Sequence, residues 1–146
     1  MTVSTMLPTR QAPPARRPAA THRPITEEGV LALVGDWFAT SNGGGPAEEI
    51  LRHLVTEGLV LRLPEGTLRS HDEVRQWWAA RNRDRSHQAR TPKDVVVRIS
   101  SPLHAEVTMS VVCAAGQETK ETWSVVARDG AARIRTRAVL GPVEPR

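Results

Sequence analysis

The feature that most constrains this chain is a change of sequence pattern at Pro92. Before this proline, apolar residues recur at helical spacing; after it, alternating and β-branched residues predict half-buried strands. Four such strands are predicted, over residues 95–100, 103–113, 119–127 and 132–140. Residue pairs with turn chemistry join them, at Ser101–Pro102, Ala115–Gly116 and Asp129–Gly130. Consecutive strands with such short joints are expected to pair antiparallel.

Two helices are predicted near the start of the folded region. The first spans about residues 27–41, because Thr26 can cap its N-terminus and an apolar stripe follows at helical spacing. The sequence NGGG at 42–45 ends this helix. Pro46 then stands at the first position of a short second helix, where proline is favoured.

A strand, a turn and a third helix are predicted within the stretch GLVLRLPEGTLRSHDEVRQWW, residues 58–78. The strand covers 59–63, and a turn at 64–66 leads to a short return strand. Ser70 followed by Glu73 is a capping box, which begins a helix that should end near residue 83.

Three helices followed by a run of hairpins predict one α+β domain over residues 26–141. We expect the three helices to pack on the concave face of a curved antiparallel sheet. Residues 1–25 are rich in Pro, Ala and Arg and are expected to form a disordered leader, and residues 142–146 a tail.

The excess of positive charge lies in this leader. The chain has 20 Lys and Arg residues against 16 Asp and Glu residues. Four of the basic residues fall within residues 1–24, which contain no acid, so the remainder of the chain balances at 16 of each sign. A nucleic-acid-binding domain needs a basic face on its fold, and we therefore expect no nucleic-acid partner.

The sequence also argues against membrane, metal and cofactor functions. No apolar run reaches the roughly 20 residues that cross a membrane, and the N-terminus lacks the apolar region of a secretory signal. A single cysteine, Cys113, fits a reducing cytoplasm. The five histidines stand singly, without metal-ligand spacing, and no Gly-rich phosphate loop is present. We therefore expect a cytoplasmic protein without metal or cofactor.

The chain resembles the NTF2-like superfamily over about residues 26–141. The resemblance rests on the first helix, LVGDWFATSN, on the stretch LVLRLPEGTLRSHDEVRQWW, and on the closing hairpin WSVVARDGAARIRTRAVL. This superfamily includes ketosteroid isomerase, SnoaL-type polyketide cyclases, limonene epoxide hydrolase and scytalone dehydratase. The resemblance implies a cone-shaped α+β fold around a pocket, but one such fold hosts many chemistries.

The catalytic residues of these relatives are not matched. The resemblance places the carboxylate base of ketosteroid isomerase near Leu63, its Tyr near Trp37 and its neutral Asp near Trp123 or Ser124. The chain contains no tyrosine. The predicted inner strand faces also lack the Asp–Arg–Asp set of limonene epoxide hydrolase. Neither mechanism is therefore carried over.

Strand alternation divides the predicted sheet into two faces. The odd residues of 103–113 are apolar and should face the helices, and those of 119–127, which include Glu121 and Trp123, should do the same. On 132–140 the even residues are expected inside, which leaves Arg133, Arg135 and Arg137 outside. The outer face would then be either a solvated surface with cross-strand ion pairs or the interface of a homodimer, as in related proteins.

Three ionisable residues are the predicted candidates for acid–base catalysis: Glu121, Asp36 and His53. Glu121 is expected inside, beside Trp123, where it could act as a general acid or base; the alternative is an ordinary acid at a wet strand end. Asp36 could equally lie on the helix surface, and a lone helix histidine such as His53 could be partly exposed.

The predicted ligand-binding residues are mostly apolar or aromatic. Four tryptophans beside one phenylalanine suit a flat, largely apolar ligand, although tryptophans also fill cores. Cys113 could likewise be a small buried hydrophobe. The predicted wall comprises Trp37, Leu61, Leu63, Trp77, Trp78, Met109, Cys113, Trp123 and Thr136.

Two functions remain open from the sequence. The first is a cofactor-independent enzyme of bacterial secondary metabolism that isomerises, cyclises, dehydrates or opens an epoxide in a small hydrophobic or polycyclic metabolite, such as a polyketide. Such chemistry needs only an oriented acid–base group in a dry pocket. The second is a non-catalytic NTF2-like module that binds a hydrophobic ligand or a protein partner.

Overall fold

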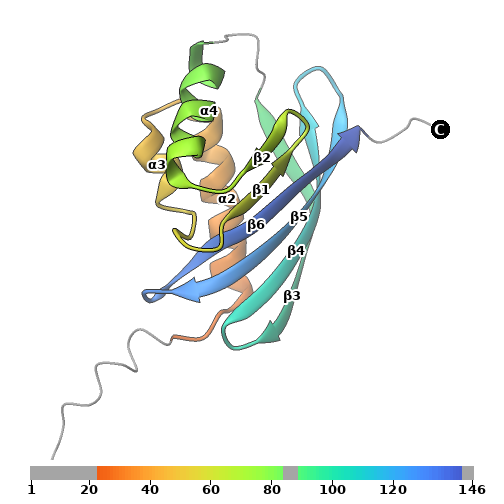
Figure 1. The fold of residues 1–146 in the computed structure, drawn as a ribbon. Helices are drawn as coiled ribbons and strands as arrows, with labels where there is room; N and C mark the ends of the chain where they lie inside the picture. Colours follow the sequence, from red (N-terminus) through yellow and green to blue (C-terminus); the bar gives the residue numbers. More distant parts are fainter. Residues whose placement is uncertain (1–22, 84–88, 143–146) are drawn as a thin grey trace, which may run out of the picture.

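The computed structural model describes residues 23–83 and 89–142 and shows helices lying against a curved sheet (Figure 1). The helices are α2 (Glu27–Gly43), α3 (Ala47–Leu51) and α4 (His71–Arg83). The strands are β1 (Val60–Leu63), β2 (Gly66–Leu68), β3 (Arg90–Ser101), β4 (His104–Cys113), β5 (Glu118–Arg128) and β6 (Ala131–Pro142). Within the described residues, three helices and one six-stranded sheet confirm the predicted α+β class. That the helices occupy the concave face in particular stays a prediction.

The two ends of the chain fall largely outside the described residues, which include neither 1–22 of the expected leader nor 143–146 of the expected tail. Ile25, at the predicted domain boundary, is buried, and its backbone N–H donates to the carbonyl of Pro102 over 2.7 Å. The packed structure therefore includes Ile25.

The sheet has the strand order β2-β1-β6-β5-β4-β3. The strands β3 to β6 pair antiparallel with their neighbours along the chain, which confirms the predicted hairpins. The short hairpin β1–β2 joins the sheet through β1, which runs parallel to β6. This pairing places the turn after β1 beside the end of β6.

Strand β3 begins at Arg90, five residues before the predicted strand. It passes through Pro92, which an edge strand tolerates because one side of the strand donates no ladder hydrogen bonds. A register shift between Lys93 and Val96, with Asp94 at a φ of 54°, marks a β-bulge. The bulge breaks the alternation that defines a strand in sequence, which explains the late predicted start.

Local capping determines where the helices begin. The Thr26 side chain accepts a hydrogen bond from the N–H of Gly29, as predicted. At α4 the N–H of Glu73 donates to the Ser70 hydroxyl, and the Glu73 carboxylate accepts from the N–H of Arg69. The predicted capping box is therefore present, with its carboxylate bonded one residue before the cap.

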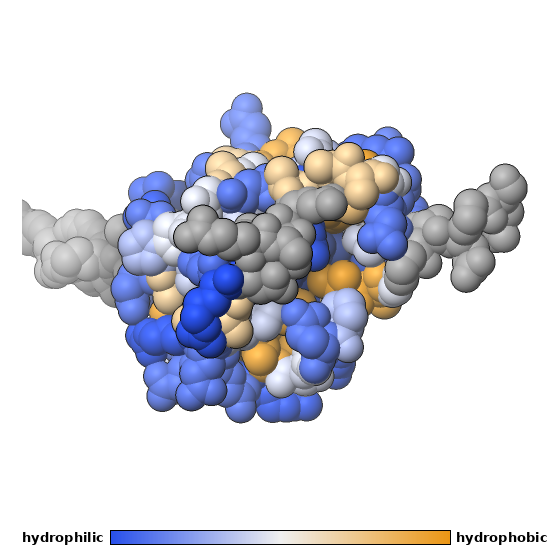
Figure 2. All heavy atoms as spheres, turned by 90° about the horizontal axis from the view of Figure 1, so that it is seen from above, coloured by the Kyte–Doolittle hydropathy of each residue, from blue (hydrophilic) through white to orange (hydrophobic). Residues whose placement is uncertain are grey.

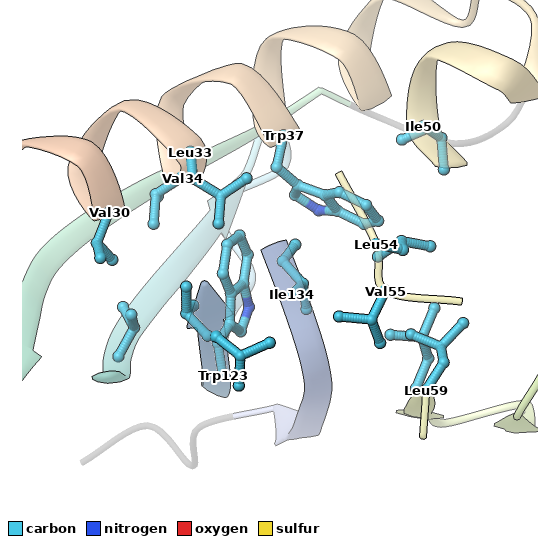
Figure 3. Packing of buried hydrophobic residues seen from close by; sticks show 14 of the residues in the cluster. Val30, Leu33, Val34, Trp37, Ile50, Leu54, Val55, Leu59, Trp123 and Ile134 are labelled. Atoms are coloured by element: carbon cyan, nitrogen blue, oxygen red, sulfur yellow. The ribbon is translucent and has the colours of Figure 1, made fainter. Parts of the chain in front are cut away.

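The core lies between α2 and the sheet. Figure 3 shows Val30, Val34 and Trp37 of α2 pointing toward Trp123 of β5 and Ile134 of β6. The rings of Trp37 and Trp123 meet edge to face, with centroids 6.0 Å apart, an arrangement that aromatic pairs favour. The helical stripe and the odd residues of β4 from Ala105 to Val111 are therefore buried as predicted, whereas Leu103, also expected inside, is exposed because it lies in the β3–β4 turn.

A β-bulge reverses the faces of β6. Ser124 pairs with Thr136, but Val125 pairs with Ile134, so Arg135 is the extra residue. From this bulge to Val139 the odd residues of β6 point inward and the even residues point outward, and a second register shift follows at the end of the strand. The prediction that Arg137 faces outward is wrong, as is the prediction of an inward Thr136.

Arg137 forms a buried ion pair with Glu121, and the two residues are 3% and 1% exposed. The Arg137 Nε and Nη2 atoms donate to Glu121 Oε1 and Oε2 over 2.8 and 2.9 Å. The indole Nε1 of Trp123 donates to the same Oε1 over 3.0 Å. The Arg137 guanidinium also lies over the Trp37 ring, 5.2 Å from its centroid. Each buried charge thus has a bidentate partner.

The outer face of the sheet carries polar residues bonded to one another. The His104 ring contacts the hydroxyls of Ser100 and Ser124, and Arg98 forms an ion pair with Glu106. These cross-strand contacts are those expected of the solvated alternative. The homodimer through this face stays a prediction.

Replacing Arg137 with methionine is expected to lower the free energy of unfolding by about 3–5 kcal/mol, because the Glu121 carboxylate would stay buried without its counter-charge. The double variant E121Q/R137M should recover part of this loss, since an amide can still accept from Trp123. Guanidinium unfolding measures both. The matched control is R135M at the exposed bulge, expected within about 0.5 kcal/mol of the parent. Equal stability of R137M and R135M would contradict this account of the pair.

Candidate functional site

A pocket of about 620 Å³ opens at one end of the sheet and is called here the end pocket. It lies where α4 and the β1–β2 turn meet the start of β3 and the adjoining ends of β4, β5 and β6. Figure 2 looks down on this end of the molecule and shows hydrophobic residues bordered by hydrophilic ones. Its main apolar walls are Leu63, Trp77, Val111, Cys113, Val139 and Leu140. Its polar lining residues are Glu65, Arg81, Arg90, Gln117, Thr119 and Arg137.

Two adjacent tryptophans of α4 have different environments. The Trp77 indole lines the end pocket, and its Nε1 donates to Glu65 Oε2 over 2.9 Å, which ties α4 to the β1–β2 turn. Trp78 is buried, and its Nε1 donates to the carbonyl of Gly45 over 2.7 Å. Successive helical residues point in directions about 100° apart, so one ring forms a pocket wall while the other joins the core.

Arg81 follows these tryptophans one turn later on α4. Its guanidinium carbon lies 5.1 Å from the Trp78 ring centroid and 5.9 Å from that of Trp77, and Nη1 donates to the carbonyl of Ser41. Burial lowers the pKa of Arg81 to about 10, with further lowering by the charges of Arg90 and Arg137. Arg81 thus remains charged at neutral pH.

The three predicted catalytic residues do not converge on the end pocket, and none of them lines it. Glu121 is buried behind this pocket in its ion pair with Arg137. Asp36 is exposed on α2. His53 is half-buried just after α3, and its ring lies edge-on to that of Trp37, with centroids 6.4 Å apart. Their catalytic roles are untested, but the geometry does not combine them into one site.

The predicted ligand-binding residues separate into three groups. Leu63, Trp77 and Cys113 line the end pocket. Thr136 lies on the other face of the sheet, beside a shallow hollow of about 280 Å³, because of the bulge in β6. The remainder are buried core residues outside the end pocket: Trp37, Leu61, Trp78, Met109 and Trp123.

The charged lining of the end pocket was missed by the sequence reasoning. Arg81 and Arg90 were missed because neither the periodicity nor a motif in the sequence around them indicates a binding site. Arg137 could have been found, because an inward Glu121 requires a buried cation and the neighbouring strand offers three arginines. Glu65 lay in a turn, where an acid needs no special role.

A second hollow, of about 480 Å³, differs from the end pocket in its chemistry. Charged residues of both signs dominate its lining, among them Glu48, Arg128, Asp129 and Arg133. It offers little apolar surface to an organic ligand. In the part of the chain described, no three His, Cys, Asp or Glu side chains are placed to hold a metal ion. Within the same ranges, no helix combines the length and apolar character that a membrane span requires.

His53 is expected to make stability depend on pH. Its Nε2 atom is buried without a hydrogen-bond partner among the described residues. Burial lowers the pKa of His53 below its ordinary value of 6.5, Arg52 and Arg133 lower it further, and Asp36 opposes them. The unfolded chain therefore takes up this proton more readily than the folded one, so stability should fall as pH drops below about 6.5.

The variant H53Q should therefore lose less unfolding free energy than the parent between pH 7.5 and pH 5, measured by guanidinium unfolding at both pH values. The matched control is H104Q, which removes a histidine from the outer face of the sheet. An undiminished decline in H53Q would show that another group is responsible.

Comparisons with known proteins identify the fold. No family model matches the chain, and no curated protein matches it. Three solved structures illustrate the structural similarity of this chain to known proteins. An uncharacterized protein with a cystatin-like fold from Caulobacter vibrioides is 16% identical, with a TM-score of 0.69 over 81% of this chain and 89% of that one.

The second, named "Putative Scytalone Dehydratase" and from Novosphingobium aromaticivorans, is 12% identical, with a TM-score of 0.69 over 80% of this chain and 83% of that one. The third is an NTF-2 like protein of unknown function from Shewanella oneidensis, 13% identical, with a TM-score of 0.63 over 77% of this chain and 96% of its own. At such sequence identities the structural similarity identifies the fold but not the function, which has to be argued from the site. The chain has the NTF2-like, or cystatin-like, fold.

Proposed function

We propose that this protein binds a small molecule with a flat, largely apolar body in the end pocket. The observation that carries the proposal is the combination of Trp77 with aliphatic walls around a volume of about 620 Å³. Small-molecule sites typically occupy about 300–1,000 Å³ and are lined mainly by apolar and aromatic side chains with a few polar groups. The end pocket has both properties.

The contacts of Glu121 favour ligand binding over catalysis by this predicted acid. Both carboxylate oxygens of Glu121 accept hydrogen bonds from Arg137, and one also accepts from Trp123. A general base must come within hydrogen-bond reach of the proton that it removes. Glu121 does not line the end pocket, so a molecule bound there has no direct access to this carboxylate.

One observation favours a second function, acid–base catalysis on the bound molecule. Glu65 lines the end pocket, and Trp77 holds one of its oxygens. It stands two residues after Leu63, the position to which the family resemblance assigns the base of ketosteroid isomerase. An oriented carboxylate beside an apolar substrate could serve an isomerisation, cyclisation, dehydration or epoxide opening. The Novosphingobium structure bears the name of one such enzyme.

The binding proposal predicts that V139F, which fills the end pocket, weakens ligand binding at least tenfold. The matched control is L103F, which adds a ring at an exposed position in the β3–β4 turn and should leave affinity unchanged. Binding of polycyclic ketones, acids and epoxides is measured by calorimetry and by tryptophan fluorescence, since Trp77 forms a wall. Equal weakening by both variants, or undiminished binding by V139F, would exclude the end pocket as the site.

The catalytic alternative predicts a different pattern for E65Q. Turnover of a bound ketone or epoxide should fall by about 10²–10⁴-fold, the usual contribution of a general base, while affinity changes little. Product formation is followed by chromatography, and E57Q, outside the end pocket, is the matched control. Unchanged turnover in E65Q would remove this residue from the mechanism.

A further inference from the structure

Three guanidinium groups converge on the end pocket: Arg81 from α4, Arg90 from the start of β3 and Arg137 from β6. Arg137 is buried, while Arg81 and Arg90 are half-buried. Elements far apart in the sequence thus bring three positive charges to a largely apolar hollow. Like charges in such a place repel one another and lose hydration, so their convergence calls for an explanation.

The described residues do not fully balance these charges. Glu121 neutralises Arg137 through its two hydrogen bonds. No carboxylate within residues 23–83 and 89–142 lies within salt-bridge distance of Arg81 or Arg90. Glu65 is the one acid among the described residues of the lining, and it raises the pKa of Arg81 less than either Arg90 or Arg137 lowers it. Among the described residues, three arginines against two acids leave one positive charge in excess.

We propose that the molecule bound in the end pocket is an organic anion, whose carboxylate pairs with Arg81 and Arg90 while its apolar body lies against Trp77 and Val139. This inference rests on the proposed function and specifies its ligand class. A guanidinium presents several N–H donors in a rigid plane that matches the two oxygens of a carboxylate. The bound anion would supply the negative charge that the described lining lacks.

The contacts of Arg81 support this assignment. Its guanidinium is held over two indole rings and anchored to the Ser41 carbonyl through Nη1. An arginine fixed in this way loses little conformational freedom when it pairs with a ligand. Its Nε and Nη2 atoms make no hydrogen bond to any described residue, so donors remain for an incoming carboxylate.

The test compares 2-naphthoate with its neutral analogue 2-naphthamide, using NMR titration and calorimetry of the full chain. The parent should bind the naphthoate at least tenfold more tightly, because hydrogen bonds to charged groups are the stronger ones. R81Q and R90Q, singly and together, should lower naphthoate affinity far more than naphthamide affinity and so remove this preference. Inorganic phosphate, which lacks an apolar body, should compete only weakly.

The matched control is R98Q, which removes an exposed arginine from the outer face of the sheet and should keep the preference. Naphthamide binding reports whether each variant is folded, and R90Q remains informative if R81Q unfolds. The preference should also shrink as salt rises, since salt screens charge.

The outcomes separate the two proposals. If naphthoate and naphthamide bind equally tightly, the proposal of an anionic ligand is refuted, while the proposed binding function stands. If neither binds, the proposed function fails as well. A preference that persists in the R81Q/R90Q double variant would refute the assignment to these arginines. Phosphate binding as tight as that of naphthoate would refute the role of the apolar body.

Discussion

The ion pair between Glu121 and Arg137 is the interaction on which the rest of the site depends. A buried pair contributes little net stability, because desolvating two charges offsets most of their attraction. Its effect is to fix geometry, since neither charge could be buried alone. Arg137 faces inward because β6 carries an extra residue at Arg135. The pair therefore fixes the register of β5 and β6, and with it the residues of β6 that reach the end pocket.

The carboxylate and the guanidinium of this pair have different roles. Glu121 contacts Arg137 and Trp123 with its oxygens and is closed to ligands, whereas Arg137 lines the end pocket. The one deeply buried acid of the described structure thus supports a cation. On the proposed ligand class, this arrangement favours the binding of negative charge in the end pocket. The chemistry follows from the side chains that the shared scaffold presents.

The sequence predicted what is local. The Thr26 cap, the capping box at Ser70, the hairpins and the apolar face of β4 all follow from neighbours a few residues apart, and the structure has them. The β6 bulge was not predictable in this way, because the position of its extra residue depends on how the whole of β6 pairs with β5. The bulge places the Thr136 side chain on the outer face of the sheet and the Arg137 side chain on the inner face, which reverses the predicted orientation of both. Leu63, Trp77 and Cys113 line the end pocket, since their positions did not depend on that register, and their role in ligand binding stays a prediction.

The balance of apolar and charged contacts determines how selective such a pocket can be. An apolar wall discriminates weakly, because one methylene more or less changes affinity by only about 10–200-fold. A polar group that is left unpaired when the wrong ligand binds discriminates far more strongly. In the end pocket, Trp77 and Val139 offer apolar area to many flat molecules alike, whereas Arg81 and Arg90 have no ion-pair partner among the described residues, and an anionic ligand would supply one. On the proposed function, affinity therefore comes chiefly from the indole and aliphatic walls, and the choice among ligands comes from the two arginines.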